Sequence, residues 1–142
     1  MSSLTIDNLS KTFGGVTAVN AVSLTVRQGE MLVLVGPSGC GKTTCLRCLA
    51  GLERPTGGRI LIGDRVVTAI EQGIFVPPEK REIGMVFQSY AVWPHMSVYE
   101  NVAYPLRAIG TSRDEIARRV PAALKLVQLD GLHDRYSSQI SG

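Results

Sequence analysis

The stretch Gly36-Pro37-Ser38-Gly39-Cys40-Gly41-Lys42-Thr43 matches the pattern GxxxxGK[ST] and decides the fold. Its glycines let the backbone adopt turns that other residues avoid, so that successive N–H groups can point inward at one anion. A helix that begins near Lys42 would add the positive end of its dipole. We expect the Lys42 ammonium to reach the β and γ phosphates of ATP and the Thr43 hydroxyl to ligate Mg²⁺, a hard cation that prefers oxygen. The stretch therefore predicts a loop that binds ATP and Mg²⁺.

The residues on both sides of the loop fit this prediction. Met31–Val35 is a continuous apolar run, as expected for a strand buried on both faces of a sheet. Lys42–Ala50 reads as a helix that stops at Gly51. A glycine-rich turn without a ligand is the simple alternative, and the flanking strand and helix argue against it. The loop leaves the reaction open, because kinases, GTPases, helicases and transporter motors share it.

Composition and charge are those of an ordinary folded domain. The chain has 142 residues, of which 44% are hydrophobic and 19% charged, and its net charge is +3. This charge is too small, and the basic residues too scattered, to predict a nucleic-acid partner. The first ten residues do not resemble a signal peptide, and no stretch approaches the roughly 20 apolar residues that span a bilayer. We therefore expect a cytoplasmic chain whose membrane role comes through a partner.

Three cysteines lie close together, at Cys40, Cys45 and Cys48. An odd number packed so closely favours reduced thiols over a framework of disulfides. Cys45 and Cys48 form a CxxC motif, which leaves redox chemistry open, although one pair cannot fill a zinc site of about four ligands. We expect them to be small apolar residues on a packed helix. The lone histidines His95 and His133 have no matching ligand set, so neither is assigned a metal.

Apolar patterns divide the chain at residue 88. Residues 1–88 read mainly as strand with one major helix, and residues 89–142 mainly as helix. The predicted strands are Leu4–Leu9, in which the alternation is imperfect, Val19–Val26, Met31–Val35, Arg59–Ile62, Arg65–Val67 and Ile83–Phe87. Gly63-Asp64 indicates a hairpin turn between two of them.

Helical signals dominate residues 89–142. Ser97–Arg107 is predicted to be a helix that Pro105 kinks or ends. Ser112-Arg113-Asp114-Glu115 fits a capping box, in which the two end residues satisfy each other's backbone N–H groups. The apolar residues that follow at helical spacing are Ile116, Val120, Leu124 and Val127. Pro121 lies inside this pattern and indicates a kink or a late start of the helix.

Several ordered motifs beyond the loop resemble the ATP-binding subunits of ABC transporters. They are Leu9–Gly15, Val22–Leu24, Leu49–Ile60, Gly84–Tyr90, Pro94–Val102 and Gln139–Gly142, the last being similar to the start of the LSGGQ signature with Ile140 in place of leucine. The resemblance covers essentially the whole chain, and Tyr90–Pro105 is most similar to importers of the sugar, iron, polyamine or phosphonate kind. It implies an α/β P-loop NTPase fold of the ABC ATPase type, truncated to an antiparallel β-subdomain, the start of the P-loop core and an α-helical subdomain.

The resemblance also implies roles for single residues. Phe13 would stack on adenine and Val19 would pack near the ribose or adenine, with an edge-strand aromatic and a core residue as the alternatives. Gln88 would lie beside the γ phosphate, where it and Lys42 would act in catalysis and where Gln88 could contact Mg²⁺ or the attacking water. The implied nucleotide-binding residues are Phe13, Val19, Gly36, Pro37, Ser38, Gly39, Cys40, Gly41, Lys42, Thr43 and Thr44, with Ser141 and Gly142 acting in trans on ATP held by a second subunit.

Partners are implied in the same way. Two ATP-binding subunits would pair head to tail, and the region Tyr90–Tyr99, with Trp93, Pro94 and His95, would dock the transmembrane permease. Local packing is the alternative reading of this aromatic region. A solute-binding protein would be an indirect partner, and the subunit would lie peripherally on the cytoplasmic face of the plasma membrane.

The resemblance places a catalytic aspartate and glutamate beyond Gly142. We therefore expect an N-terminal fragment that binds ATP and does not hydrolyse it alone. Ile60–Asp64 and Leu126–Asp130 each end in an acid, but they read as a hairpin and a helix. A nucleotide kinase or GTPase would need a lid arginine set or an NKxD motif, which the sequence lacks. A module that holds nucleotide only to pair with another subunit remains an alternative.

Overall fold

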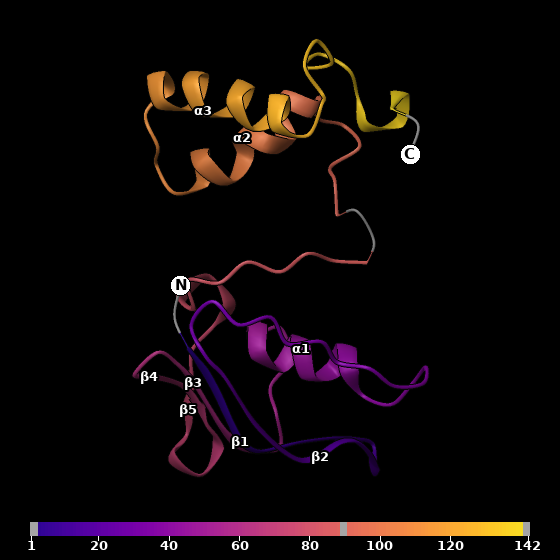
Figure 1. Ribbon diagram of the computed structural model, residues 1–142, viewed down its shortest axis with the longest axis vertical. Helices are drawn as coiled ribbons and strands as arrows, with labels where there is room; N and C mark the ends of the chain where they lie inside the picture. The colour runs from indigo at the N-terminus through magenta and orange to yellow at the C-terminus, as the bar shows by residue number, and fades with distance from the viewer. Residues whose placement is uncertain (1–2, 89–90, 141–142) are drawn as a thin grey trace. The chain divides into compact units, whose positions relative to one another are not determined.

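The computed structural model describes residues 3–88 and 91–140, and the chain forms two compact units, Met1–Met85 and Val86–Gly142 (Figure 1). The first unit holds the strands and one helix, and the second holds two further helices. The boundary that the sequence places after residue 88 remains a prediction.

A five-stranded sheet in the order β2-β1-β3-β4-β5 forms the first unit, and all neighbouring strands are antiparallel. The strands are β1 (Leu4–Phe13), β2 (Val16–Val26), β3 (Gly57–Ile62), β4 (Arg65–Ala69) and β5 (Ile74–Phe75). Ile62 pairs with Arg65 across Gly63-Asp64, and Gly63 has a φ of +59°. The predicted β-subdomain and its two-residue hairpin are therefore confirmed.

A bulge in β1 explains why its alternation looks imperfect. The register against β2 shifts between Ile6 and Leu9, and Asn8 has a φ of +49°. An extra residue on one strand moves the inward-facing positions from even to odd numbers. Ile6 and Leu9 are consequently both buried, with 2% and 0% of their surface exposed.

Helix α1 (Lys42–Ala50) packs against the sheet of this unit (Figure 1). Its bounds are those predicted, because Gly51 adopts a φ of +78° and its N–H group caps the last turn. The helix buries Cys45 and Cys48 in a core with sheet residues that include Ile60 and Val67.

Two predicted strands are wrong in this structure. Met31–Val35 and Ile83–Phe87 form no strand, and several of their side chains are exposed, with 89% for Met31, 88% for Val35 and 98% for Val86. An apolar run shows that a segment favours burial, but a strand exists only where a neighbour supplies hydrogen bonds. Among the described residues, no strand lies beside either run.

The second unit is a pair of helices, α2 (Val98–Ala108) and α3 (Arg113–Leu126), which pack on one another. Their common core consists of Val98, Ala103, Ile116, Val120 and Leu124. Three short 3₁₀ segments complete the described elements: η1 (Ile70–Gln72) and η2 (Pro78–Lys80) in the first unit, and η3 (Ser137–Gln139) in the second. Val127, expected on the apolar stripe, lies just past α3 and is 63% exposed.

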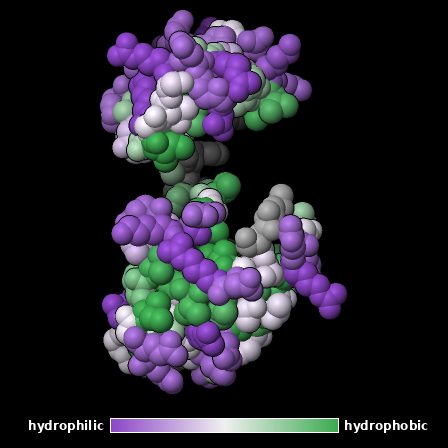
Figure 2. Space-filling model, turned by 90° about the vertical axis from the view of Figure 1, so that its left-hand side faces the viewer, coloured by the Kyte–Doolittle hydropathy of each residue, from purple (hydrophilic) through white to green (hydrophobic). Residues whose placement is uncertain are grey.

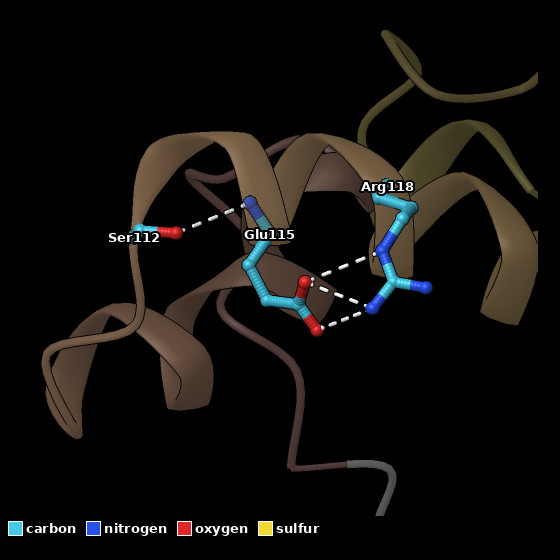
Figure 3. Close-up of polar contacts among 3 residues, drawn as sticks. All are labelled: Ser112, Glu115 and Arg118. Carbon is cyan, nitrogen blue, oxygen red and sulfur yellow. Dashed lines mark hydrogen bonds and ion pairs between the residues drawn. The ribbon is translucent and has the colours of Figure 1, made fainter.

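The capping box predicted at Ser112–Glu115 forms only in part (Figure 3). The Ser112 hydroxyl accepts a hydrogen bond from the Glu115 backbone N–H at 3.3 Å. The Glu115 carboxylate turns instead to Arg118, one turn along α3, whose Nη2 lies 2.7 Å from Oε1. A complete capping box occurs at the start of α2, between Ser97 and Glu100, where the sequence reading did not identify one.

The two prolines inside the helices do not end them. Pro105 lies in the last turn of α2, which runs on to Ala108. Pro121 lies in the middle of α3, which begins at Arg113, so the predicted late start is wrong. Packing of α3 against α2 through Val120 and Leu124 offsets the local cost of about 3 kcal/mol.

Hydrophobic side chains gather on one face of the first unit, where polar side chains surround them (Figure 2).

None of the helices that the structure describes has the length and apolar character needed to cross a lipid bilayer.

Candidate nucleotide site

The predicted phosphate loop connects directly to α1, whose first residue is Lys42. Gly39 and Gly41 have φ values of +80° and +91°, which glycine adopts without strain. A Cβ at Gly41 would lie 2.1 Å from the backbone oxygen of Ala18 in β2. Glycine is thus needed at Gly41 for two reasons, the dihedral angle and the close approach of the loop to β2.

The Lys42 side chain folds back over the loop. Its Nζ donates hydrogen bonds to the carbonyl oxygens of Gly36 and Pro37, at 2.7 Å each, and lies 3.3 Å from the Sγ of Cys40. The ammonium is therefore held at the mouth of the loop by neutral acceptors. A phosphate oxygen is a stronger partner for an ammonium than a carbonyl oxygen, because both groups are then charged.

The residues that would hold Mg²⁺ fit a hard cation. Thr43 and Thr44 follow Lys42 in the first turn of α1, and Thr43 is exposed. The described residues contain no cluster of three or more histidine, cysteine or acidic side chains that could hold a metal alone. Mg²⁺ commonly takes one or two protein oxygens together with water and phosphate oxygens. The Thr43 hydroxyl suits the protein part of such a set.

A cavity of about 510 Å³ lies between the loop, β2 and the segment that precedes the loop. Its lining includes Val19, Val35, Cys40, Gly41 and Lys42. Val19 is only 5% exposed and also belongs to the core of the first unit. The two readings of Val19, site wall and core residue, are thus compatible.

Phe13 lies at the end of β1 and does not line this cavity. Phe13 is 44% exposed, and the Nζ of Lys11 lies 4.5 Å from its ring centroid. Lys11 also forms a salt bridge with Glu53, in which its Nζ lies 2.6 Å from the Glu53 Oε1. An exposed ring beside a cation can accept a flat base, but the contact with adenine remains a prediction.

The CxxC pair is packed within the protein, as expected for structural thiols. Cys45 and Cys48 are buried, with 6% and 0% exposure, and burial raises the pKa of both. For Cys48 the pKa rises to about 11, first through desolvation and then through the neighbouring Cys45. Neutral, enclosed thiols react slowly. Cys40 is the exposed cysteine of the three.

Sequence reasoning missed Arg81, which is 98% buried. Its guanidinium donates to the carbonyl oxygens of Cys48 and Leu49, at 3.0 and 2.8 Å, and therefore touches the C-terminal end of α1. In the sequence, Lys80-Arg81 looks like a solvated charged pair after two prolines. No local pattern signals that this arginine is buried.

The other predicted functional residues lie outside the first unit, which contains the loop. Gln88 is exposed and belongs to the second unit, so its place beside a γ phosphate remains a prediction. Ser141 and Gly142, predicted to act in trans, lie outside the described residues, as does Tyr90.

Asn101 organises the described part of the predicted docking region. Its Oδ1 accepts from the Trp93 N–H at 2.8 Å, and its Nδ2 donates to the carbonyl oxygens of Trp93, Met96 and Ser97 at 3.0–3.1 Å. The Trp93 ring packs on Tyr104, with centroids 4.4 Å apart, although 40% of its surface stays exposed. The sequence reading did not identify this role of Asn101.

Comparison with known families decides the membership. The family model described as ABC transporter matches residues 19–142. The chain belongs to the ABC transporter family. The resemblance inferred from the sequence motifs is therefore confirmed, together with the family's fold.

Known ABC proteins match along nearly the whole chain. The trehalose/maltose import ATP-binding protein MalK of Thermococcus litoralis is 51% identical over 142 residues, which cover 100% of this chain and 38% of MalK. The Fe(3+) ions import ATP-binding protein FbpC of Brucella abortus is 50% identical, covering 99% of this chain and 38% of FbpC. The sn-glycerol-3-phosphate import ATP-binding protein UgpC of Ruegeria pomeroyi is also 50% identical, covering 100% and 39%. The chain thus spans less than two fifths of the length of these relatives.

A solved ABC structure supports the same fold. The dimeric ATP-binding cassette MJ0796, in a post-hydrolysis state bound to ADP and Pi, superposes with a TM-score of 0.79 and 28% identity. The match covers 97% of this chain and 63% of the cassette.

Proposed function

We propose that this chain is the ATP-binding part of an ABC importer subunit, which couples binding and hydrolysis of ATP to solute transport. The loop Gly36–Thr43 carries the proposal: the left-handed conformations of Gly39 and Gly41, the helix that begins at Lys42 and the Lys42 ammonium folded over the loop all support an anion site there. The relatives named above are import ATP-binding proteins, which supports the importer assignment.

The loop residues would bind the nucleotide by electrostatics. Backbone N–H groups of Gly39–Thr43 and the start of α1 would surround the β phosphate. Lys42 would leave the carbonyl oxygens of Gly36 and Pro37 for phosphate oxygens, exchanging two neutral partners for charged ones. Bound Mg²⁺ would neutralise part of the phosphate charge, and the Thr43 hydroxyl would hold it at the first turn of α1.

Hydrolysis would need a catalytic acid or base, and among the described residues no acidic side chain lines the cavity beside the loop. Gln88 is proposed to position water or Mg²⁺, and Ser141 and Gly142 to act on ATP held by a paired subunit. We therefore propose that the 142-residue chain binds ATP and does not turn it over alone.

The partners are a second ATP-binding subunit and a permease. The dimeric state of the cassette MJ0796 supports pairing. The region Tyr90–Tyr99 is the proposed permease contact, because Asn101 orders its backbone and Trp93 remains partly exposed. A solute-binding protein would act indirectly, and the subunit would lie on the cytoplasmic face of the membrane.

Calorimetric titration of the purified chain with ATP, with and without Mg²⁺, tests the proposal. Wild type should bind with magnesium-dependent affinity, and Lys42→Ala should weaken binding at least 10-fold. Lys125→Ala is the matched control, since this exposed lysine lies on α3 and should leave affinity unchanged. Absence of binding by folded wild-type protein would refute the proposal. Mg²⁺-dependent turnover that Lys42→Ala abolishes would refute the claim that the chain is inactive alone.

Competition between ATP and GTP distinguishes the proposed ABC ATPase from the alternative enzyme class, a GTPase. The chain lacks a guanine-reading motif, so ATP and GTP should differ little in affinity if Phe13 merely stacks on the base. A GTPase would prefer GTP by orders of magnitude, because its site would hydrogen-bond the guanine edge.

A further inference from the structure

Arg81 makes four hydrogen bonds that together join three segments of the first unit. Its Nη1 donates to Cys48 and Leu49, the carbonyl oxygens near the end of α1. Its Nε donates to the carbonyl oxygen of Val76 at 2.8 Å, and its Nη2 donates to the Thr68 hydroxyl in β4 at 3.0 Å. The guanidinium therefore ties the C-terminal end of the loop helix to the sheet.

The surroundings are built to receive this side chain. The ring of Phe75 lies 5.1 Å from the Arg81 Cζ, within the range of a cation–π contact. Gly51 leaves the space that the guanidinium needs, because a Cβ there would lie 2.5 Å from Nε. In the part of the chain that the structure describes, no carboxylate pairs with Arg81. The carbonyl oxygens at the end of α1, which carry the partial negative charge of a helix C-terminus, stabilise the guanidinium in place of a carboxylate.

Stability alone is a weak reason for this arrangement. Arg81 is 98% buried, so its charge is poorly solvated, and this burial lowers its pKa. A well-packed apolar side chain of similar volume often stabilises a fold as well as or better than a buried charge. A directional contact such as Arg81 makes with Cys48 and Leu49, in contrast, sets where the end of α1 lies.

The geometry points to Arg81 as a positioning residue for the nucleotide site, acting through α1. This inference rests on the proposed function. Helix α1 has 9 residues, so it is about 13 Å long and behaves as a short rigid rod. A tilt of about 5° at its C-terminal end displaces its N-terminal end, where Lys42 and Thr43 lie, by about 1 Å. Misplacement on this scale weakens the interactions of positioned groups severely.

Binding measured beside folding tests the inference in the purified protein. Arg81→Lys keeps the charge but cannot bridge the same acceptors, and we expect the Kd for MgATP to rise about 10-fold at a temperature where the variant is folded. Arg81→Met should raise it further. Thr68→Val removes one acceptor with little change of shape and should raise the Kd about 2-fold to 3-fold. Arg59→Met is the matched control, because this arginine is exposed on β3 of the same unit and should leave the Kd unchanged.

The results separate a positioning role from a structural one. A lower melting temperature with an unchanged Kd in Arg81→Lys would show that Arg81 only stabilises the fold and would overturn the inference. If both Arg81 variants fail to fold, an unchanged Kd in Thr68→Val would overturn it as well. Absence of MgATP binding by the folded wild-type protein would instead refute the proposed function. The titration of the wild-type protein reports this outcome separately from the comparison of the variants.

Discussion

Replacement of Gly41 by alanine probes the closest approach within the nucleotide site. The added Cβ would lie 2.1 Å from the Ala18 oxygen, whereas ordinary contacts begin at 3.4 Å, so loop and β2 must separate by more than 1 Å. The φ of +91° adds strain for any residue with a Cβ, of about 1–2 kcal/mol. Overpacking of this kind typically costs a further ~1–3 kcal/mol. We therefore expect Gly41→Ala to lose about 2–5 kcal/mol of unfolding free energy.

Gly39→Ala is the matched comparison for this variant. Gly39 has a similar φ of +80°, but a Cβ there would meet no atom within 4 Å. It should lose only the strain of about 1–2 kcal/mol. The difference between Gly41→Ala and Gly39→Ala thus isolates the contact with Ala18.

Urea denaturation of the two variants, followed by circular dichroism, measures this difference. Both variants should also bind MgATP more weakly, since each changes the backbone that surrounds the phosphates. Equal losses of unfolding free energy in the two variants would show that the loop does not pack on β2 as described. Gly110→Ala serves as a control in the second unit, because Gly110 has a φ of +76° and a Cβ there would meet no atom within 4 Å.

Three further predictions concern single side chains. A bulky maleimide should label Cys40 first, because Cys40 is exposed while Cys45 and Cys48 are buried. Labelling should abolish MgATP binding, and saturating MgATP should protect the thiol. Unchanged binding after full labelling of Cys40 would contradict the loop geometry. The folded pKa of Cys48, about 11, exceeds its ordinary value of 9.0, so the stability that it contributes is complete below pH 9 and is lost as pH rises towards 11. Denaturation between pH 8 and 11 should show this loss, at most about 3 kcal/mol, and a Cys48→Ala variant should show a flatter profile. Asn101→Ala removes four hydrogen bonds and should speed proteolysis near Trp93 at least several-fold, whereas equal cleavage rates would show that Asn101 does not order this region.

Local signals in the sequence were sufficient for much of the fold and for the centre of the site. Gly51 specifies the end of α1, and Gly63-Asp64 specifies a hairpin, because their conformational preferences act within a few residues. The loop Gly36–Thr43 is recognisable for the same reason, since the glycines, Lys42 and Thr43 that define the motif are the residues expected to bind phosphate and Mg²⁺. These predictions needed no knowledge of distant contacts.

Other features depended on residues far away in the chain. Met31–Val35 has the pattern of a buried strand, yet it forms none, because no described strand pairs with it.

The sequence by itself determined the phosphate loop, the helix after it and the antiparallel hairpin, because each follows from backbone preferences over a few residues. Tertiary structure alone decided that Arg81 is buried against the end of α1 and that Gly41 contacts Ala18, because both depend on segments more than 20 residues apart meeting in space.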